Sequence, residues 1–127
     1  MRADLHIHTT ASDGTWDPGQ VVKAVCAAGI EFFAITDHDS VANVADTKKL
    51  AEKAGLRFLP GVELNSTKDG HNYHILGYGI DIENKKLLEL CRHKGTSTRE
   101  TIGILKASQK RTKRAPLRLA FTSSTPA

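Results

Sequence analysis

Short apolar segments of strand character alternate with amphipathic segments of helical character over the first ninety residues, and this alternation constrains the fold most strongly. The segments that predict strands are residues 3–8, 31–36, 56–59 and 74–78, and those that predict helices start at Pro18, near Ser40 and at Glu83. Strands joined to helices through short loops form right-handed βαβ units. The chain is therefore predicted to be an α/β protein with about four parallel strands and intervening helices.

Local signals predict where the first two helices begin and which side chains they bury. Asp17 before Pro18 is typical of an N-cap and a first helical position, and Gly29 is typical of a helix end. Ser40 is predicted to cap the second helix, which should end at Gly55. The side chains expected to face inward are Val21, Val22, Val25 and Cys26 in the first helix, and Val41, Val44, Leu50 and Ala51 in the second.

Composition excludes several classes of protein. The 127 residues fit one domain, and 39% hydrophobic with 25% charged residues is typical of a globular chain. No apolar run approaches the roughly 18–20 residues that cross a bilayer, and the N-terminus lacks the pattern of a secretory signal. Cys26 and Cys91 have no CxxC spacing. We therefore expect no disulfide framework, no membrane partner and a cytoplasmic location.

The charge balance changes sharply along the chain. Residues 1–90 hold nine Lys and Arg against thirteen Asp and Glu, whereas residues 91–127 hold nine against one. A basic tail of this kind can contact nucleic acid. Phe121 is its only aromatic residue, however, so it has no aromatic series for base stacking. The favoured interpretation is an irregular, solvated basic tail, with a weak helix over residues 98–110 and disorder from Lys113 onward.

Candidate metal ligands follow the ends of the predicted strands. They are His6 and His8 at the first, Asp13 in the loop after it, His38 after the second, Glu63 after the third and His74 at the fourth. The carboxyl ends of strands in a βα architecture gather at one rim. Residues two apart on a strand share a face, so His6 and His8 can reach one ion. Several imidazoles with two carboxylates suit Zn, Mn or Fe, and a carboxylate between two ions can bridge them.

Each of these residues also has a structural explanation without a ligand. A lone HxH pair is more often a surface or core pair, and Asp37-His38-Asp39 can cap the next helix. Glu63 after Pro-Gly can be a solvated turn residue. His71 is assigned to a loop, and Trp16 and Tyr73 are assigned to packing. The metal-site hypothesis rests on the conjunction, because four separate strand ends each supply a His or a Glu.

Four motifs occur in an order that is typical of one family. They are DLHIHTTASDGT (Asp4–Thr15), AITDHDS (Ala34–Ser40), PGVELN (Pro60–Asn65) and HILGYGID (His74–Asp81). In these motifs the chain resembles the PHP (polymerase and histidinol phosphatase) family, and most of all its small stand-alone phosphoesterases that act on nucleotides and short RNA ends. The resemblance covers about residues 3–90 and implies part of a distorted (β/α)7 barrel whose family members hold two or three divalent metal ions.

The resemblance also implies roles for individual residues. By position, His6 and His8 match ligands of the first metal, and Glu63 matches the carboxylate that bridges the first and second metals. His74 matches a ligand of the second metal. Asp13 and His38 match ligands of a third metal site or groups next to the phosphate. Asp37 matches no ligand and is expected to orient a histidine. The implied reaction is hydrolysis of a phosphorylated small molecule or nucleotide by metal-activated water, with Glu63, Asp13 and His38 as catalytic residues.

The resemblance ends near Cys91, whereas family domains are longer and draw further His and Asp ligands from later strands. We therefore expect a fragment, a frameshifted reading or a truncated product. It should bind about one divalent ion through His6, His8 and Glu63 and turn over poorly. The alternative is a non-catalytic metal-binding fragment that needs other strands to complete the barrel. A related amidohydrolase-type enzyme, which also opens with HxH, is a third and less favoured interpretation.

Overall fold

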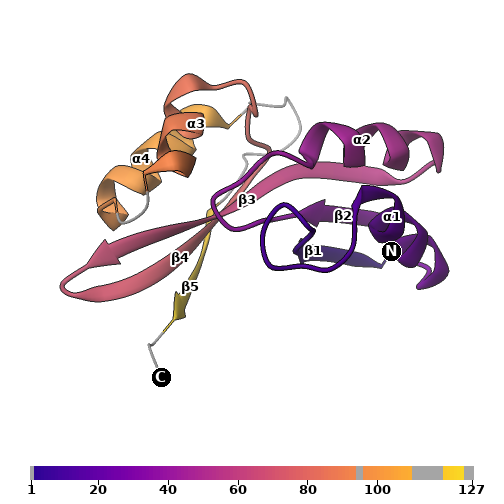
Figure 1. The fold of residues 1–127 in the computed structure, drawn as a ribbon, viewed down its shortest axis with the longest axis horizontal. Helices are drawn as coiled ribbons and strands as arrows, with labels where there is room; N and C mark the ends of the chain where they lie inside the picture. The colour runs from indigo at the N-terminus through magenta and orange to yellow at the C-terminus, as the bar shows by residue number, and fades with distance from the viewer. Residues whose placement is uncertain (1, 94–95, 110–118, 125–127) are drawn as a thin grey trace.

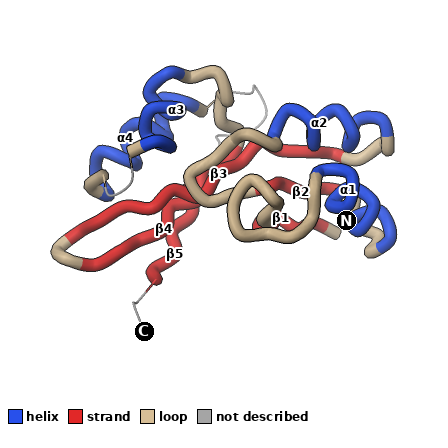
Figure 2. Tube along the Cα trace, viewed as in Figure 1, coloured by secondary structure: helices blue, strands red, loops and turns tan. Residues whose placement is uncertain are grey.

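The computed structural model describes residues 2–93, 96–109 and 119–124 and shows one sheet flanked by helices (Figure 1; Figure 2). The elements in chain order are β1 (Ala3–Ile7), α1 (Pro18–Ala27), β2 (Phe32–Ile35), α2 (Val44–Lys53), β3 (Arg57–Lys68), β4 (His71–Tyr78), α3 (Lys85–Arg92), α4 (Thr98–Ser108) and β5 (Leu119–Ser124). The strands are hydrogen-bonded in the order β1-β2-β3-β4-β5. The α/β class is confirmed.

The sheet is parallel at one end and antiparallel at the other. Strands β1, β2 and β3 are parallel, whereas β4 and β5 are antiparallel to their neighbours. The prediction of about four parallel strands is therefore wrong at the fourth. Strand β3 does not stop at Leu59 but runs on to Lys68, and it turns back into β4 through Asp69-Gly70. Both of these residues have positive φ, 52° and 77°, as a two-residue hairpin turn requires.

Helix α1 forms where its signals predicted. The Asp17 carboxylate accepts from the Gln20 N–H at 2.9 Å, and the Gln20 amide oxygen accepts from the Asp17 N–H at 3.0 Å. This reciprocal pair is a capping box, and Gly29 with φ 71° follows the helix end. The helix buries its three valines, but Cys26 is exposed. The prediction of an inward Cys26 is wrong because the apolar stripe is completed by Val25, one residue earlier.

Helix α2 begins later than predicted. The Ser40 hydroxyl accepts from the Ala42 N–H at 3.2 Å within the preceding turn, so it does not cap the helix. Asn43 occupies the cap position without a capping hydrogen bond, since its side-chain amide is used elsewhere. Val44 and Ala51 are buried as expected, and Val41 packs against the core. Leu50 is 37% exposed, so its predicted burial is wrong.

Two hydrophobic clusters stabilise the two ends of the sheet. The first joins α1, β2 and α2, and its buried members are Val21, Val22, Val25, Phe33, Ile35, Val44 and Ala51. The second joins β3, β4, α3 and α4, and its buried members are Val62, Leu64, Ile75, Ile80, Leu87, Leu90 and Leu105. Val41 and Ile82 pack against both. Figure 1 shows the two helix pairs at opposite ends of the sheet, so β3 is the strand that joins the two halves.

The described residues toward the C-terminus contain more regular structure than the composition of this segment predicted. Helix α3 starts at Lys85, two residues later than expected, because Asn84 caps it by accepting from the Leu87 N–H at 3.0 Å. The predicted helix over 98–110 is confirmed and ends at Ser108. Disorder from Lys113 onward is wrong for Leu119–Ser124, which form β5, while the rest of that prediction lies outside the described residues. No described helix is long and apolar enough to cross a membrane.

Gly61 lies where β3 leaves β2 and begins to pair with β4. A methyl group there would lie 2.8 Å from the Ile35 carbonyl oxygen and 2.9 Å from a Thr36 methyl carbon. We expect Gly61→Ala to destabilise the chain by about 1–3 kcal/mol through overpacking, measured by urea unfolding. Gly103→Ala is the control, because nothing lies within 4 Å of its added carbon; it should stabilise α4 by about 0.5–1 kcal/mol. Equal effects of the two substitutions would contradict this account.

Candidate metal centre

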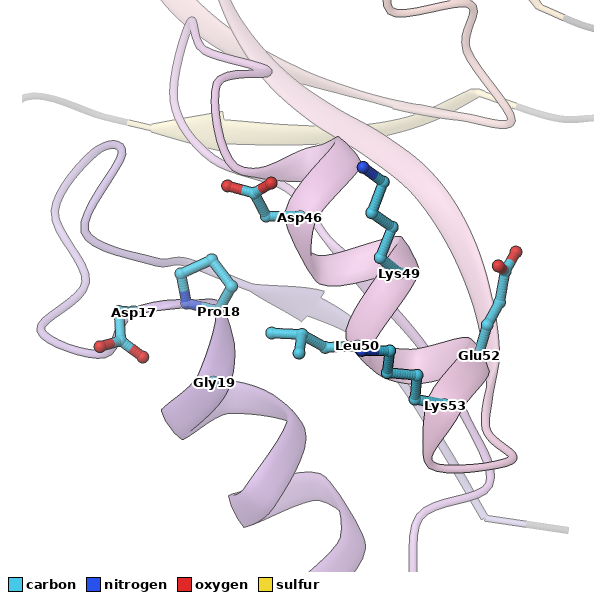
Figure 3. A pocket seen from close by; sticks show the side chains of 8 residues that line it. All are labelled: Asp17, Pro18, Gly19, Asp46, Lys49, Leu50, Glu52 and Lys53. Atoms are coloured by element: carbon cyan, nitrogen blue, oxygen red, sulfur yellow. The ribbon is translucent and has the colours of Figure 1, made fainter.

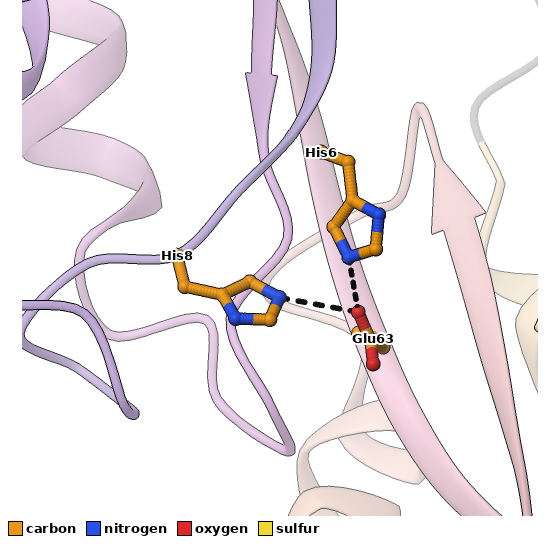
Figure 4. A group of neighbouring side chains, drawn as sticks. All are labelled: His6, His8 and Glu63. Atoms are coloured by element: carbon orange, nitrogen blue, oxygen red, sulfur yellow. Dashed lines mark hydrogen bonds and ion pairs between the residues drawn. The ribbon is translucent and has the colours of Figure 1, made fainter. Parts of the chain in front are cut away.

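The carboxylate of Glu63 on β3 lies at the centre of a group of histidines. One oxygen, Oε1, lies 2.6 Å from His6 Nε2 and 3.1 Å from His8 Nε2 (Figure 4). The other oxygen, Oε2, lies 2.8 Å from His74 Nδ1 and 3.3 Å from His38 Nδ1. Glu63 is only 2% exposed, whereas each imidazole is partly open to solvent. A single buried carboxylate therefore joins imidazoles from three separate parts of the chain.

Asp13 completes the group from the loop that follows β1. Its two carboxylate oxygens lie 2.7 Å from His8 Nδ1 and 3.4 Å from His38 Nε2. The loop folds back closely on the end of β1, since a Cβ on Gly14 would lie 2.3 Å from the His8 carbonyl oxygen. Glycine is therefore required there for Asp13 to reach the histidines. All six candidate ligands inferred from the sequence are brought to one rim.

These residues form three overlapping trios whose ligand atoms lie within 4.8 Å of one another. The trios are His6, His8 and Glu63; His8, Asp13 and His38; and His38, Glu63 and His74. Imidazole nitrogens and carboxylate oxygens are the donors that Zn²⁺ and similar divalent ions prefer. The donor set therefore fits metal ions of this class.

The number of lone pairs limits how many ions these residues can hold together. A neutral imidazole has one nitrogen lone pair available to a metal, because the other nitrogen carries a proton. His8 is shared by the first and second trios and His38 by the second and third, so neither ring can complete both of its trios. Glu63 can serve two ions because its two oxygens point to different histidines. The described residues therefore supply at most two complete three-ligand sets, joined by Glu63.

Asp37 holds the loop after β1 and makes no hydrogen bond to a histidine among the described contacts. One of its oxygens accepts from the Thr9 N–H at 2.6 Å and from the Ser12 hydroxyl at 2.6 Å, and the other accepts from the Thr9 hydroxyl at 2.7 Å. Asn43 adds a bond to the Thr9 hydroxyl at 2.9 Å. The expectation that Asp37 orients a histidine ring is therefore corrected. Asp37 instead fixes the backbone of Thr9 and Ser12, which are the neighbours of His8 and Asp13 in the chain.

The segment after β2 is tied to β3 beside the central carboxylate. The Glu63 N–H donates to the Asp37 carbonyl at 3.0 Å, and the Asp39 N–H donates to the Glu63 carbonyl at 2.9 Å. The Asp39 carboxylate accepts from the backbone and side-chain amides of Asn65 at 3.1 and 2.7 Å. Asp39 has φ 49°, which is uncommon for a residue other than glycine. This turn holds His38 against Glu63, and only its Asp-His-Asp composition was visible in the sequence.

The histidines determine the charge state of both carboxylates. Burial acts to raise the pKa of Glu63, but the field of His38 and the hydrogen bond from His6 outweigh it, and the pKa lies below its ordinary value of 4.5. For Asp13, desolvation again acts to raise the pKa, and the fields of His8 and His38 lower it below 3.8. Both carboxylates are therefore ionised at neutral pH, as carboxylates must be to bind a metal ion.

Tyr78 is a residue near the cluster that the sequence analysis missed. Its hydroxyl donates to the Leu5 carbonyl on β1 at 2.7 Å. Burial raises the pKa of Tyr78, and the neighbouring Glu63 and Asp4 charges raise it further, so the hydroxyl keeps its proton. Two-residue periodicity along β4 was a usable signal, since it places Tyr78 on the face of the strand that carries His74.

Three residues that the sequence analysis assigned to structural roles, His71, Trp16 and Tyr73, lie outside the cluster. His71 is exposed and belongs to none of the trios, but it starts strand β4 and is not in a loop as predicted. Trp16 is 49% exposed, so its assignment to packing is wrong. Tyr73 is half-buried on β4.

An open hollow of about 930 Å³ lies between α1 and α2, away from the histidines (Figure 3). Its lining residues are Asp17, Pro18, Gly19, Asp46, Lys49, Leu50, Glu52 and Lys53. This lining mixes acidic and basic side chains and contains none of the six ligands. Cavity size therefore does not identify the site, whereas the convergence of imidazoles on one carboxylate does.

Comparison with known proteins agrees with the motifs. The PHP domain model matches residues 4–116, which extends beyond the four motifs into the basic segment. The chain is 39% identical over 88 residues to the 5'-3' exoribonuclease Rnm of Escherichia coli, covering 68% of this chain and 30% of that protein. It is 38% identical over 78 residues to a 3',5'-nucleoside bisphosphate phosphatase of Chromobacterium violaceum, covering 61% and 27%.

Solved structures show the same fold. An amidohydrolase from Chromobacterium violaceum, solved with bound sulfate and without metal, matches with a TM-score of 0.70 and 34% identity. A metal-dependent phosphoesterase from Bifidobacterium adolescentis matches with a TM-score of 0.68 and 28% identity. Each match covers 72% of this chain and 32% of the other. The chain thus has the fold of part of a PHP-type barrel and spans about a third of the length of these relatives.

Asp37 should stabilise the chain through its three hydrogen bonds to Thr9 and Ser12, two of which are buried. Asp37→Asn replaces one acceptor oxygen with an amide NH2 group that faces the donors of Thr9 or Ser12. We therefore expect a loss of about 1–3 kcal/mol in the free energy of unfolding. The control is Asp69→Asn at the exposed hairpin turn, where φ is 52° and asparagine is well tolerated; its effect should stay within about 0.5 kcal/mol. Similar values for the two variants in urea unfolding would exclude the role assigned to Asp37.

Glu63 should make the stability of the metal-free chain depend on pH. Its folded-state pKa lies below 4.5, so its ionised form stabilises the fold above that pH. This contribution should be lost as the pH falls through the folded-state value. Thermal unfolding in EDTA at a series of pH values should show this decline in the wild type. Glu63→Gln should show less of it, and Glu52→Gln on the exposed face of α2 should keep it. An identical decline in Glu63→Gln would assign the pH dependence to other groups.

Proposed function

Because this chain belongs to the PHP domain family, we propose that it carries the N-terminal metal-binding part of a metal-dependent phosphoesterase. The single observation that supports this most strongly is the contact of the Glu63 carboxylate with four imidazoles at one rim. Four imidazoles that converge on one buried carboxylate place several metal-donor atoms around one point, and such clusters of perturbed ionisable groups are more typical of functional sites than of packing. Hydrolysis of a phosphoester is the reaction that this donor set suits best.

The residues would divide the work by their position. His6, His8 and Glu63 would hold one divalent ion, and Glu63 and His74 would contribute to holding a second. Asp13 and His38 either hold a third ion or lie next to the phosphate. Zn, Mn and Fe all suit these donors. When bound, such ions supply Lewis-acid stabilisation of phosphoryl oxygens and a site for activating water.

The substrate proposed is a phosphorylated nucleotide or a short RNA end. Two relatives with more than a third of their aligned residues identical are named as a 5'-3' exoribonuclease and a 3',5'-nucleoside bisphosphate phosphatase. Ions at the rim would neutralise the charge that builds up on the phosphoryl oxygens. The Asp37-held loop and the Asp39 turn keep the ligands in place during this step, because their backbones are fixed by hydrogen bonds.

The second candidate function is a metal-binding chain without turnover of its own. The ligand count is compatible with it, since the described residues supply at most two three-ligand sets and these two sets share Glu63. A third ion would then depend on ligands from other strands. If a partner chain that supplies the remaining strands restores turnover, the chain is an incomplete part of an enzyme and not an inactive protein.

We expect the 127-residue chain to bind about one Zn²⁺ or Mn²⁺ and to hydrolyse p-nitrophenyl phosphate and nucleotides poorly in the presence of Mn²⁺. His6→Ala and Glu63→Gln should each weaken metal binding by at least about tenfold in calorimetric titration, since even the loss of a group behind a ligand costs that much. His71→Ala is the control, because this exposed histidine on the same sheet is outside the cluster.

The outcomes separate the two candidates. Robust turnover that Glu63→Gln abolishes and His71→Ala preserves would exclude the non-catalytic chain. Stoichiometric metal binding without turnover would favour it. Metal binding that is equally weak in the wild type, His6→Ala and Glu63→Gln would contradict the metal site itself.

A further inference from the structure

The backbone around His6 is not held by a regular strand ladder. The pairing of β1 with β2 is regular at Ala3 and Asp4 and resumes at Ile7, with a register shift between them. Within this interval the His6 N–H donates to the Asp4 carboxylate at 3.1 Å. The position of His6 therefore depends on contacts other than those of the β1–β2 ladder.

Tyr78 supplies one of these contacts from the far side of the sheet. Its hydroxyl donates to the Leu5 carbonyl at 2.7 Å, although the two residues are 73 positions apart. Strands β2 and β3 lie between β1 and β4 in the sheet. Three strand spacings of about 4.8 Å would put β1 beyond the reach of a tyrosine on β4 if the sheet were flat. The bond therefore spans the concave side of a curled sheet and ties its two halves together.

The geometry of the peptide unit connects this bond to the metal ligand. The Leu5 carbonyl and the His6 N–H belong to the same planar peptide, which also includes the His6 Cα. Tyr78 holds the oxygen of this plane and Asp4 holds its hydrogen. Fixing both ends fixes the position of the His6 Cα and leaves only the backbone φ and the side-chain torsions of His6 to set where its ring lies, 2.6 Å from Glu63.

Tyr78 is also placed relative to Glu63 itself. It pairs with Gly61, and Gly61 is two residues before Glu63 on β3, so Tyr78 and Glu63 share a face of the sheet. The side chain therefore runs along the face that carries the central carboxylate and ends on the strand that carries His6.

We propose that Tyr78 is a positioning residue for the metal subsite of His6, His8 and Glu63, acting through the Leu5–His6 peptide. The inference rests on the proposed metal site and adds a residue to it. A tyrosine that only stabilised the fold would affect unfolding without changing the metal subsite in the folded chain. A positioning residue changes how the folded chain binds the ion.

Co²⁺ titration tests this directly, because its visible absorption reports both affinity and ligand geometry. Tyr78→Phe removes only the hydroxyl and should weaken Co²⁺ binding by about tenfold, as losses behind a ligand typically do, and should alter the absorption bands. Replacement of Tyr78 by 4-aminophenylalanine, which keeps a donor at the same point, should restore both. Tyr73→Phe is the matched control, since it removes a hydroxyl from the same strand that does not contact Leu5. Thermal unfolding without metal shows that every variant is folded at the titration temperature.

The results distinguish the two proposals. Wild-type affinity and bands in Tyr78→Phe, beside a clear Co²⁺ signal in the wild type, would overturn the positioning role and leave the metal site intact. A wild-type chain that gives no Co²⁺ signal would overturn both. If Tyr78→Phe does not fold, 4-aminophenylalanine and 4-methoxyphenylalanine at residue 78 are compared, because only the amine can donate. Equal Co²⁺ affinity of these two proteins would overturn the positioning role.

Discussion

The burial of one carboxylate is the constraint on which the rest of this structure depends. An ionised group taken out of water costs several kcal/mol unless hydrogen bonds or opposite charges compensate it. Glu63 is buried at 2% exposure, and the imidazoles of His6, His8, His38 and His74 surround its two oxygens. A metal ion would provide the same compensation more strongly. The fold therefore places an ionised carboxylate, surrounded by possible metal donors, at the junction of its two halves.

The long strand β3 makes this junction possible. It pairs with β2 in parallel over residues 57–60 and with β4 in antiparallel over residues 61–68. Glu63 lies just beyond the change of partner, so one neighbour brings the segment that carries His38 and the other brings His74. The two hydrophobic clusters hold these halves from either end. A sheet of uniformly parallel strands would not place His74 directly across from Asn65, two residues from Glu63.

Polar contacts behind the ligands fix the loops that the hydrophobic clusters do not reach. Asp37 is hydrogen-bonded to the loop that carries His8 and Asp13, and Asp39 is hydrogen-bonded to Asn65 beside His38. Tyr78 is hydrogen-bonded to the peptide before His6. Each of these contacts joins residues more than 25 positions apart. All three have the same effect, because each fixes a backbone segment that lacks regular strand pairing and that carries a candidate ligand.

The sequence alone determined the candidate ligands and the local elements, and the tertiary structure decided how they are combined. The capping signals of Asp17-Pro18, the apolar strands and the six candidate His, Asp and Glu ligands were readable because they appear as local patterns within a few residues. The Asp69-Gly70 hairpin signal was present in the sequence but was overlooked. The antiparallel β4, the role of Asp37 toward Thr9 and Ser12, and the bond from Tyr78 to Leu5 were not readable in this way. These depend on which distant segments the twisted sheet brings together, and periodicity along one strand carries no information about its partner.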